Sequence, residues 1–137
     1  DSWRPIVFVN DHYVSWQVFT LYRVAAGCVV SSLHDGMNLV AKEFVAARDD
    51  LRGVLVLSQF TGAARELTDA VLFNPYAVDE FAQALYQALT MSPEEQEQRM
   101  RRLRSQVADN NIYRWAGMLL SEASRHVDAR QLVGDPL

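Results

Sequence analysis

A strand, a tight turn and the start of a helix meet in one stretch, Leu33-His34-Asp35-Gly36-Met37-Asn38-Leu39-Val40-Ala41-Lys42-Glu43. The apolar run 27–31 leads into this stretch, and apolar residues recur at helical spacing after it. Gly36 permits turn conformations that a side chain would forbid. Asn38 is a suitable N-cap for the helix. The pattern therefore predicts a strand followed by a helix running to about Ala47.

The same turn carries groups that suit a phosphorylated sugar ligand. A helix that starts at Asn38 presents free N–H groups and a positive dipole end, which favour a phosphate. Asp35 places a carboxylate beside it as an acceptor for sugar hydroxyls, and Glu43, one helical turn further, could reach a ribose diol. An Asp-Gly turn after a strand is also an ordinary connection that binds nothing. On the residues alone, both interpretations stay open.

Short apolar runs along the rest of the chain predict a parallel sheet. The runs lack the alternation of a half-exposed strand, which indicates burial on both faces. Helical patterns alternate with them, as in βαβ units, so ligands are expected at the carboxyl ends of the strands. We predict α/β architecture with helices on both faces of the sheet and strands at 5–9, 28–31, 54–57 and 70–73. The connecting helices are expected at 15–27, 38–47 and 61–67.

The last third of the chain is predicted to be helical. An apolar stripe starts at Val78, and Ser92-Pro93-Glu94-Glu95 is a strong helix start. The arginines at 99, 101, 102 and 104 are interpreted as a solvated helix face in preference to an anion site. A final helix from Ile112 is expected to pack back onto the fold. Residues 129–137 are expected to form a flexible tail.

Composition narrows the function classes. The 137 residues suit one domain, and a net charge of −4 argues against non-specific nucleic-acid binding. No apolar run is long enough to span a membrane. The single cysteine, Cys28, is expected to be a buried structural thiol, which fits a cytoplasmic protein. No His or Cys pair has metal-ligand spacing, and Gly-x-Gly-x-x-Gly is absent, so neither a metal nor a dinucleotide cofactor is expected.

Three longer segments carry a resemblance to a known family. They are Asp-Gly-Met-Asn-Leu-Val-Ala-Lys-Glu-Phe-Val-Ala (35–46), Val-Leu-Val-Leu-Ser-Gln-Phe-Thr-Gly-Ala-Ala-Arg-Glu-Leu (54–67) and Val-Leu-Phe-Asn-Pro-Tyr (71–76). In this order they resemble the trehalose-6-phosphate synthase family, over about residues 21–115. That family consists of retaining glucosyltransferases with two Rossmann-like lobes, which move glucose from a nucleotide donor to glucose 6-phosphate. The resemblance implies that residues 1–128 form the C-terminal part of the donor-binding lobe.

The resemblance also implies roles for individual residues. Asp35 would accept a hydroxyl of the donor glucose, and Glu43 would bind the ribose. The donor implied is UDP-glucose or GDP-glucose, bound as a substrate and without a cofactor or metal. Backbone N–H groups would supply the other contacts, those of Gly36, Met37 and Asn38 to glucose and those of Leu39 and Val40 to the diphosphate.

The resemblance leaves the acceptor open. The family usually has arginine where this chain has His34, next to the acceptor. The cations that neutralise the leaving diphosphate, and the N-terminal lobe, are expected outside this chain, so it should be inactive alone, with no catalytic residue assigned in it. A relative with another acceptor, such as glycerol 3-phosphate or an amino-cyclitol phosphate, and a non-catalytic binding lobe remain alternatives. A homo-oligomer is also left open.

Overall fold

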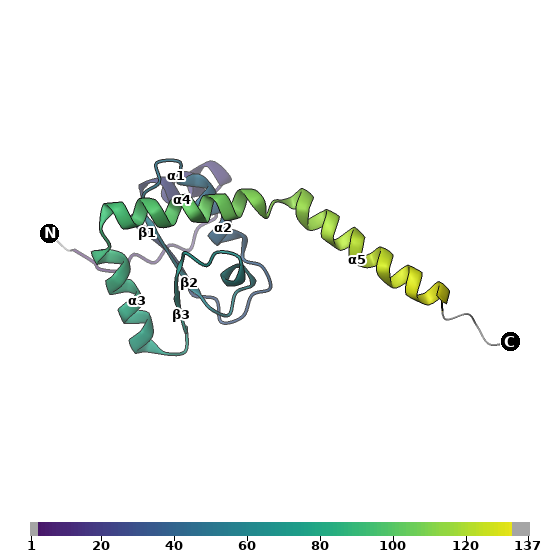
Figure 1. Ribbon diagram of the computed structural model, residues 1–137. Coiled ribbons are helices and arrows are strands. Elements are labelled where there is room, and N and C mark those ends of the chain that lie inside the picture. The colour runs from purple at the N-terminus through teal and green to yellow at the C-terminus, as the bar shows by residue number, and fades with distance from the viewer. Residues whose placement is uncertain (1–2, 133–137) are drawn as a thin grey trace.

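The computed structural model describes residues 3–132, with side chains to residue 125, and its centre is a parallel sheet (Figure 1). Three strands form this sheet in the order β1 (Gly27–Val30), β2 (Val54–Ser58) and β3 (Val71–Phe73). Gly27 pairs with Val54, and Val56 pairs with Val71. All residues of the central strand β2 are buried, as its unbroken apolar sequence predicts. The expected parallel α/β sheet is confirmed.

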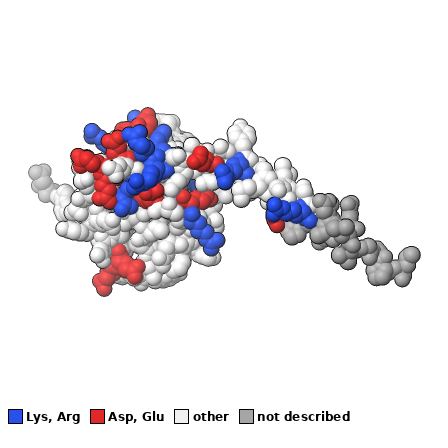
Figure 2. All heavy atoms as spheres, in the orientation of Figure 1, with Lys and Arg blue, Asp and Glu red and all other residues white. Residues whose placement is uncertain are grey.

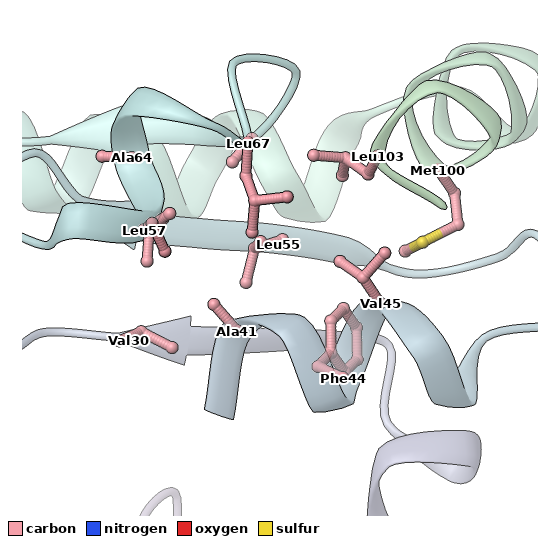
Figure 3. Close-up of a cluster of buried hydrophobic side chains, with 12 residues drawn as sticks. Val30, Ala41, Phe44, Val45, Leu55, Leu57, Ala64, Leu67, Met100 and Leu103 are labelled. Atoms are coloured by element: carbon pink, nitrogen blue, oxygen red, sulfur yellow. The ribbon is translucent and has the colours of Figure 1, made fainter. Parts of the chain in front are cut away.

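Helices cover both faces of the sheet. On one face, α2 (Leu39–Ala47) packs against β1 and β2, with α1 (Ser15–Val24) and α4 (Pro93–Asp109) beside it. On the other face, α3 (Val78–Thr90) packs against β2 and β3. Successive β2 residues serve opposite cores: Leu55 and Leu57 join the α2 side, and Val56 joins the α3 side. Figure 3 shows side chains of α2 pointing toward those of β2 and α4.

The starts of α4 and α1 are satisfied in different ways. Ser92 caps α4 as predicted, because its hydroxyl accepts the Glu95 N–H at 3.3 Å. Ser15 does not cap α1 but is its first residue, and Val14 is the N-cap. The side chain of Gln17 accepts the Val14 N–H at 3.0 Å and satisfies the helix start. The segment 61–67 forms only the short 3₁₀ helix η1 (Gly62–Arg65).

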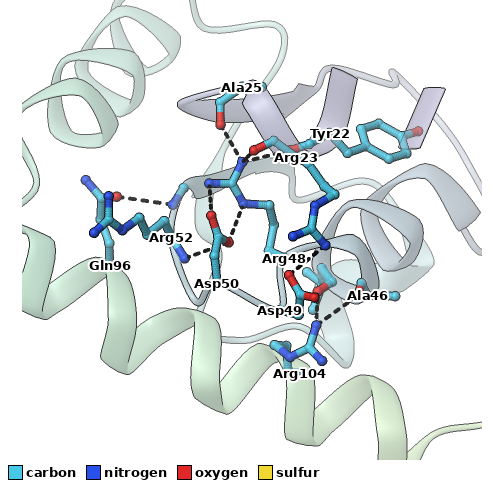
Figure 4. A network of polar contacts seen from close by, with 12 residues as sticks. Tyr22, Arg23, Ala25, Ala46, Arg48, Asp49, Asp50, Arg52, Gln96 and Arg104 are labelled. Atoms are coloured by element: carbon cyan, nitrogen blue, oxygen red, sulfur yellow. Dashed lines mark hydrogen bonds and ion pairs between the residues drawn. The ribbon is translucent and has the colours of Figure 1, made fainter. Parts of the chain in front are cut away.

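A buried arginine joins three elements at the amino end of the sheet (Figure 4). The guanidinium of Arg48, which is 4% exposed, donates to the carbonyls of Tyr22, Arg23 and Ala25 at 2.6–2.9 Å. It also pairs with the carboxylate of Asp50 through two nitrogens, at 3.0 and 3.1 Å. These bonds satisfy the last carbonyls of α1 and fix the loop before β2.

The arginines of α4 are engaged by the protein itself, so no free anion site forms from them. Arg99 and Arg101 pair with carboxylates four residues earlier on the same helix, and Arg102 pairs with Asp69 at 2.6 Å. Arg104 donates to carbonyls at the end of α2. Figure 2 shows positive and negative side chains intermixed over the α4 side of the molecule. A single-sign surface is not present in that view, which agrees with the predicted solvated helix face.

The predicted strand at 5–9 is wrong. No strand forms there, and Ile6, Val7 and Phe8 are 76–88% exposed. An apolar run becomes a strand only beside a partner that takes its backbone hydrogen bonds. Among the described residues, no strand pairs with this segment. The loop 10–12 therefore does not follow a strand.

The last helix does not pack back onto the fold. Helix α5 (Ile112–Leu132) runs away from the sheet (Figure 1), and Tyr113, Met118 and Leu120 are 65–84% exposed. Both faces of the sheet are already covered, one by α2 and the other by α3. The start of the expected tail, 129–132, lies within α5, and 133–137 lie outside the described residues. No described helix combines the length and apolarity needed to cross a membrane.

Candidate functional site

Three turns meet at the carboxyl edge of the sheet, where ligands were expected. They follow β1, β2 and β3 and contain Asp35, Phe60 and Tyr76, respectively. The Asp35 N–H donates to the Phe60 carbonyl at 3.4 Å, and the rings of Phe60 and Tyr76 meet edge to face at 5.7 Å. The turns after the strands thus form one connected surface. The aromatic pair was missed in the sequence, because nothing in either segment shows that the two turns touch.

The carboxylate of Asp35 organises the first of these turns, which we call the Asp35 turn (35–38). Its Oδ1 accepts the backbone N–H groups of Met37 and Asn38, both at 3.0 Å. Its Oδ2 accepts the side-chain amide of Asn38 at 2.9 Å. The hydrogen bond from Met37, then those from Asn38, lower the pKa of Asp35 below its ordinary value. The carboxylate is therefore fixed as an ionised acceptor at this edge.

Asn38 caps α2, as predicted. Its side-chain Oδ1 accepts the Ala41 N–H at 2.9 Å, and Asn38 is buried, with a left-handed φ of 68°. Among the described residues, no group accepts the backbone N–H of Leu39 or Val40. These two donors at the positive end of α2 are the pair predicted to face a diphosphate. The N–H groups of Met37 and Asn38, predicted for glucose, are instead held by Asp35 in this structure.

The other predicted site residues lie around this turn. His34 is exposed and precedes it, and its charge contributes to lowering the pKa of Asp35. Glu43 is exposed on α2 and accepts a hydrogen bond from the Tyr22 hydroxyl at 3.4 Å. Burial, then Glu43, raises the pKa of Tyr22, so this phenol remains a donor. Gly36 is exposed, and a Cβ on it would meet no atom within 4 Å.

Glu66, which follows η1, also lies against α2. Its carboxylate pairs with the Lys42 ammonium at 2.7 Å. Lys42 belongs to α2 and Glu66 is the C-cap of η1, so the pair joins the two elements. Both residues line a cavity of about 550 Å³ between the start of α2 and the start of α5, together with Met37, Leu39, Val107, Asn110, Asn111, Ile112, Arg114, Trp115 and Met118.

Two other chemistries receive no support from the described part of the chain. No three His, Cys, Asp or Glu side chains in it gather as metal ligands would. Cys28 is half-buried in β1, and burial raises the pKa of its thiol to about 11. A thiol with this pKa is protonated at neutral pH and unsuited to nucleophilic attack.

Comparisons with known proteins point to one family. The sequence profile of glycosyltransferase family 20 matches residues 1–125. Trehalose-6-phosphate synthase of Escherichia coli K12 is 44% identical over 127 residues, which are 92% of this chain and 27% of that enzyme. The chain therefore spans about a quarter of the length of such curated relatives.

Solved structures agree in fold as well as in sequence. Trehalose-6-phosphate synthase from Escherichia coli, bound with UDP-2-fluoro glucose, is 45% identical with a TM-score of 0.83, over 88% of this chain and 27% of that one. The alpha,alpha-trehalose-phosphate synthase (UDP-forming) of Burkholderia xenovorans, in complex with glucose-6-phosphate, is 41% identical with a TM-score of 0.83. That match covers 88% of this chain and 27% of the Burkholderia chain.

Proposed function

Because the chain belongs to glycosyltransferase family 20, we propose that it is the nucleotide-sugar-binding part of a retaining glucosyltransferase. The complete gene product would transfer glucose from UDP-glucose or GDP-glucose to glucose 6-phosphate. In that reaction the bond between glucose C1 and the diphosphate breaks, a bond from C1 to an acceptor hydroxyl oxygen forms, and the nucleoside diphosphate leaves with the proton that this hydroxyl loses. In this proposal, residues 1–128 are the C-terminal part of the donor-binding lobe.

The start of α2 is the observation that carries the proposal. The N–H groups of Leu39 and Val40, which have no acceptor among the described residues, lie at the positive end of the helix, directly after the Asp35 turn. A diphosphate bound there gains hydrogen bonds and a favourable dipole, a combination typical of phosphate sites at helix starts. A single helix start binds many anions, so the sugar has to be selected by the neighbouring turn.

The Asp35 turn supplies groups for the sugar. The carboxylate oxygens of Asp35 have lone pairs beyond those used within the turn, and a glucose hydroxyl could donate to them. A Cβ on Gly36 would meet no described atom within 4 Å, so a sugar can approach the turn from this side of Gly36. A hydroxyl that competes for the N–H groups of Met37 or Asn38 has to replace their bonds to Asp35. Glu43, a helical turn further along α2, is placed to accept from the ribose.

The chemical step requires positive charge near the departing diphosphate. The single lysine of the sequence, Lys42 of α2, is already neutralised by Glu66 at 2.7 Å. We therefore propose that the neutralising cations, and the lobe that binds the acceptor, belong to the rest of the gene product. The exposed apolar side chains of α5, such as Tyr113 and Met118, offer a surface for that lobe. The 137-residue chain alone should bind donor weakly and transfer nothing.

Activity of the complete gene product tests the proposal. Purified protein is incubated with UDP-glucose or GDP-glucose and glucose 6-phosphate, and release of nucleoside diphosphate and formation of the disaccharide phosphate are followed. Because His34 stands where arginine is usual, glycerol 3-phosphate and amino-cyclitol phosphates are tested as acceptors in parallel. Donor binding without transfer to any acceptor would favour a non-catalytic binding lobe. Absence of binding to either donor contradicts the proposal.

A further inference from the structure

We infer that Gly62 is a positioning residue, which holds the Asp35 turn in the shape that selects the sugar half of the donor. This inference rests on the proposed function, because the turn that it positions is the proposed sugar-binding turn. Gly62 itself need not touch the donor. Its contribution comes from how closely η1 approaches the backbone of Gly36.

Main-chain hydrogen bonds join η1 to the Asp35 turn on both sides of Gly36. The Gly62 N–H donates to the Asp35 carbonyl at 2.8 Å, and the Ala63 N–H donates to the Met37 carbonyl at 2.9 Å. Asp35 and Thr61 also form an isolated parallel bridge beyond the ends of β1 and β2. Hydrogen bonds from η1 thus fix the conformation of the turn, in addition to those that the Asp35 side chain accepts.

The approach leaves no room for a side chain at residue 62. A Cβ on Gly62 would lie 2.0 Å from the Gly36 carbonyl oxygen and 2.7 Å from its carbon. Real Cβ contacts essentially never fall below 3.0 Å, so the Gly36 peptide would have to shift by about 1 Å. Gly62 does not have a positive φ, so the requirement is for space and not for an unusual backbone conformation.

The helix η1 is anchored at both ends and cannot easily retreat to make that room. At its start, the buried hydroxyl of Thr61 donates to the Ser58 carbonyl at 2.9 Å, which ties it to the end of β2. At its end, Glu66 pairs with the Lys42 ammonium of α2, whose side chain is only 17% exposed. A side chain at Gly62 is therefore expected to displace the more exposed Asp35 turn.

The chain offers a matched control for this strain. A Cβ on Gly27 would lie 2.9 Å from the Val54 carbonyl oxygen, at the amino end of β1, far along the strand from the Asp35 turn. Gly27→Ala should therefore lower stability through the sheet without changing the turn. Gly117→Ala adds a Cβ in open space within α5; it should leave the turn unchanged and, as a glycine replaced in a helix interior, should not lower stability.

The test compares dissociation constants of a nucleotide sugar and its nucleoside diphosphate in the complete gene product. UDP-glucose with UDP, and GDP-glucose with GDP, are titrated by calorimetry into wild type, Gly62→Ala, Gly27→Ala and Gly117→Ala. We expect Gly62→Ala to weaken the sugar nucleotide by about tenfold, as for loss of one well-placed hydrogen bond, and the plain diphosphate by less than about threefold. The two control variants should keep the wild-type ratio of the constants, with a lower melting temperature for Gly27→Ala.

The possible results of this titration distinguish failure of the positioning role from failure of the proposed function. Equal losses for both ligands, or no loss, in folded Gly62→Ala overturn the positioning role and leave the proposed function standing. If wild type binds neither sugar nucleotide, the proposed function fails, and this inference fails with it. Should Gly62→Ala not fold, Glu66→Gln replaces it, since it releases the far end of η1 without inserting atoms. Because the freed Lys42 ammonium acts on the diphosphate of both ligands alike, the expected effect is on the ratio of the two dissociation constants, which should shift against the sugar nucleotide by about two- to threefold. An unchanged ratio overturns the role.

Discussion

Asp35 and Asn38 hold each other through two contacts across the turn. Oδ2 of Asp35 accepts the side-chain amide of Asn38 at 2.9 Å, and Oδ1 accepts the Asn38 backbone N–H at 3.0 Å. The side-chain oxygen of Asn38, Oδ1, accepts the Ala41 N–H and so caps α2. The turn proposed to select the sugar and the helix start proposed to bind the diphosphate are thus built as one unit.

Replacing Asn38 should separate its two structural contributions. Asn38→Gly keeps the left-handed backbone but removes the cap and the bond to Asp35, for an expected loss of about 1 kcal/mol in unfolding free energy. Asn38→Ala should lose about 2–3 kcal/mol, because a Cβ also disfavours φ of 68°. Urea unfolding of both variants measures this. Equal losses would show that residue 38 is not held in the left-handed region.

The hydrogen bonds to Asp35 predict a direction for its titration. They lower the pKa of Asp35 in the folded protein, with the Met37 N–H as the largest cause. A lowered pKa means that the contribution of these bonds is fully present above the ordinary aspartate pKa of about 4, and is lost as the pH falls through the folded value. Carboxyl ¹³C shifts of Asp35, followed from pH 7 to pH 2, should give a midpoint below the ordinary aspartate value of about 4. A midpoint at or above that ordinary value would argue against the bonded turn.

Arg48 should matter far more for stability than the surface arginines. Arg48→Ala leaves three carbonyls and Asp50 without their buried donor, for an expected loss of about 3–5 kcal/mol. Arg101→Ala, which removes an exposed pair with Glu97 at 2.6 Å, should cost less than about 1 kcal/mol. Denaturant unfolding compares the two. Similar losses of unfolding free energy in the two variants would show that the buried network of Arg48 does not hold α1 to the loop before β2.

Local patterns predicted the elements whose partners lie within the described chain. The sheet from Gly27 to Phe73 and the caps at Asn38 and Ser92 are fixed by neighbouring residues, and the structure contains them. The segment 5–9 and the face of α5 have equally apolar sequences but no partner surface here. An apolar pattern indicates that a face will be buried, but it does not indicate which surface will cover that face.

The candidate site likewise contains features that a single stretch of sequence predicts and one contact that it does not. The Asp35 turn and the start of α2 were predicted from one continuous stretch, because Asn38 and Ala41 lie within one helical turn. The contact between Gly62 and Gly36 was not, since it joins segments 26 residues apart whose approach depends on sheet packing. Gly62, Ala63 and Ala64 are small enough for close packing, but their sequence does not indicate which segment they pack against.

In the proposed site, the Asp35 carboxylate selects the sugar half of the donor. The start of α2, together with Glu43, binds the nucleotide half. Asp35→Asn is the sharpest variant, because its amide oxygen can still accept the N–H groups of Met37 and Asn38 while the charge and the second acceptor are lost. Glu43→Gln is its counterpart on α2.

The most direct measurement is calorimetric titration of the complete gene product with UDP-glucose and UDP, or with the guanosine pair if wild type prefers it. Asp35→Asn should weaken the sugar nucleotide by about ten- to a hundredfold, as expected for a lost charge-assisted hydrogen bond, and leave the plain diphosphate within about twofold. Glu43→Gln should weaken both ligands by the same factor. Equal losses of the two ligands in Asp35→Asn, or no loss of either, would show that this carboxylate does not select the sugar.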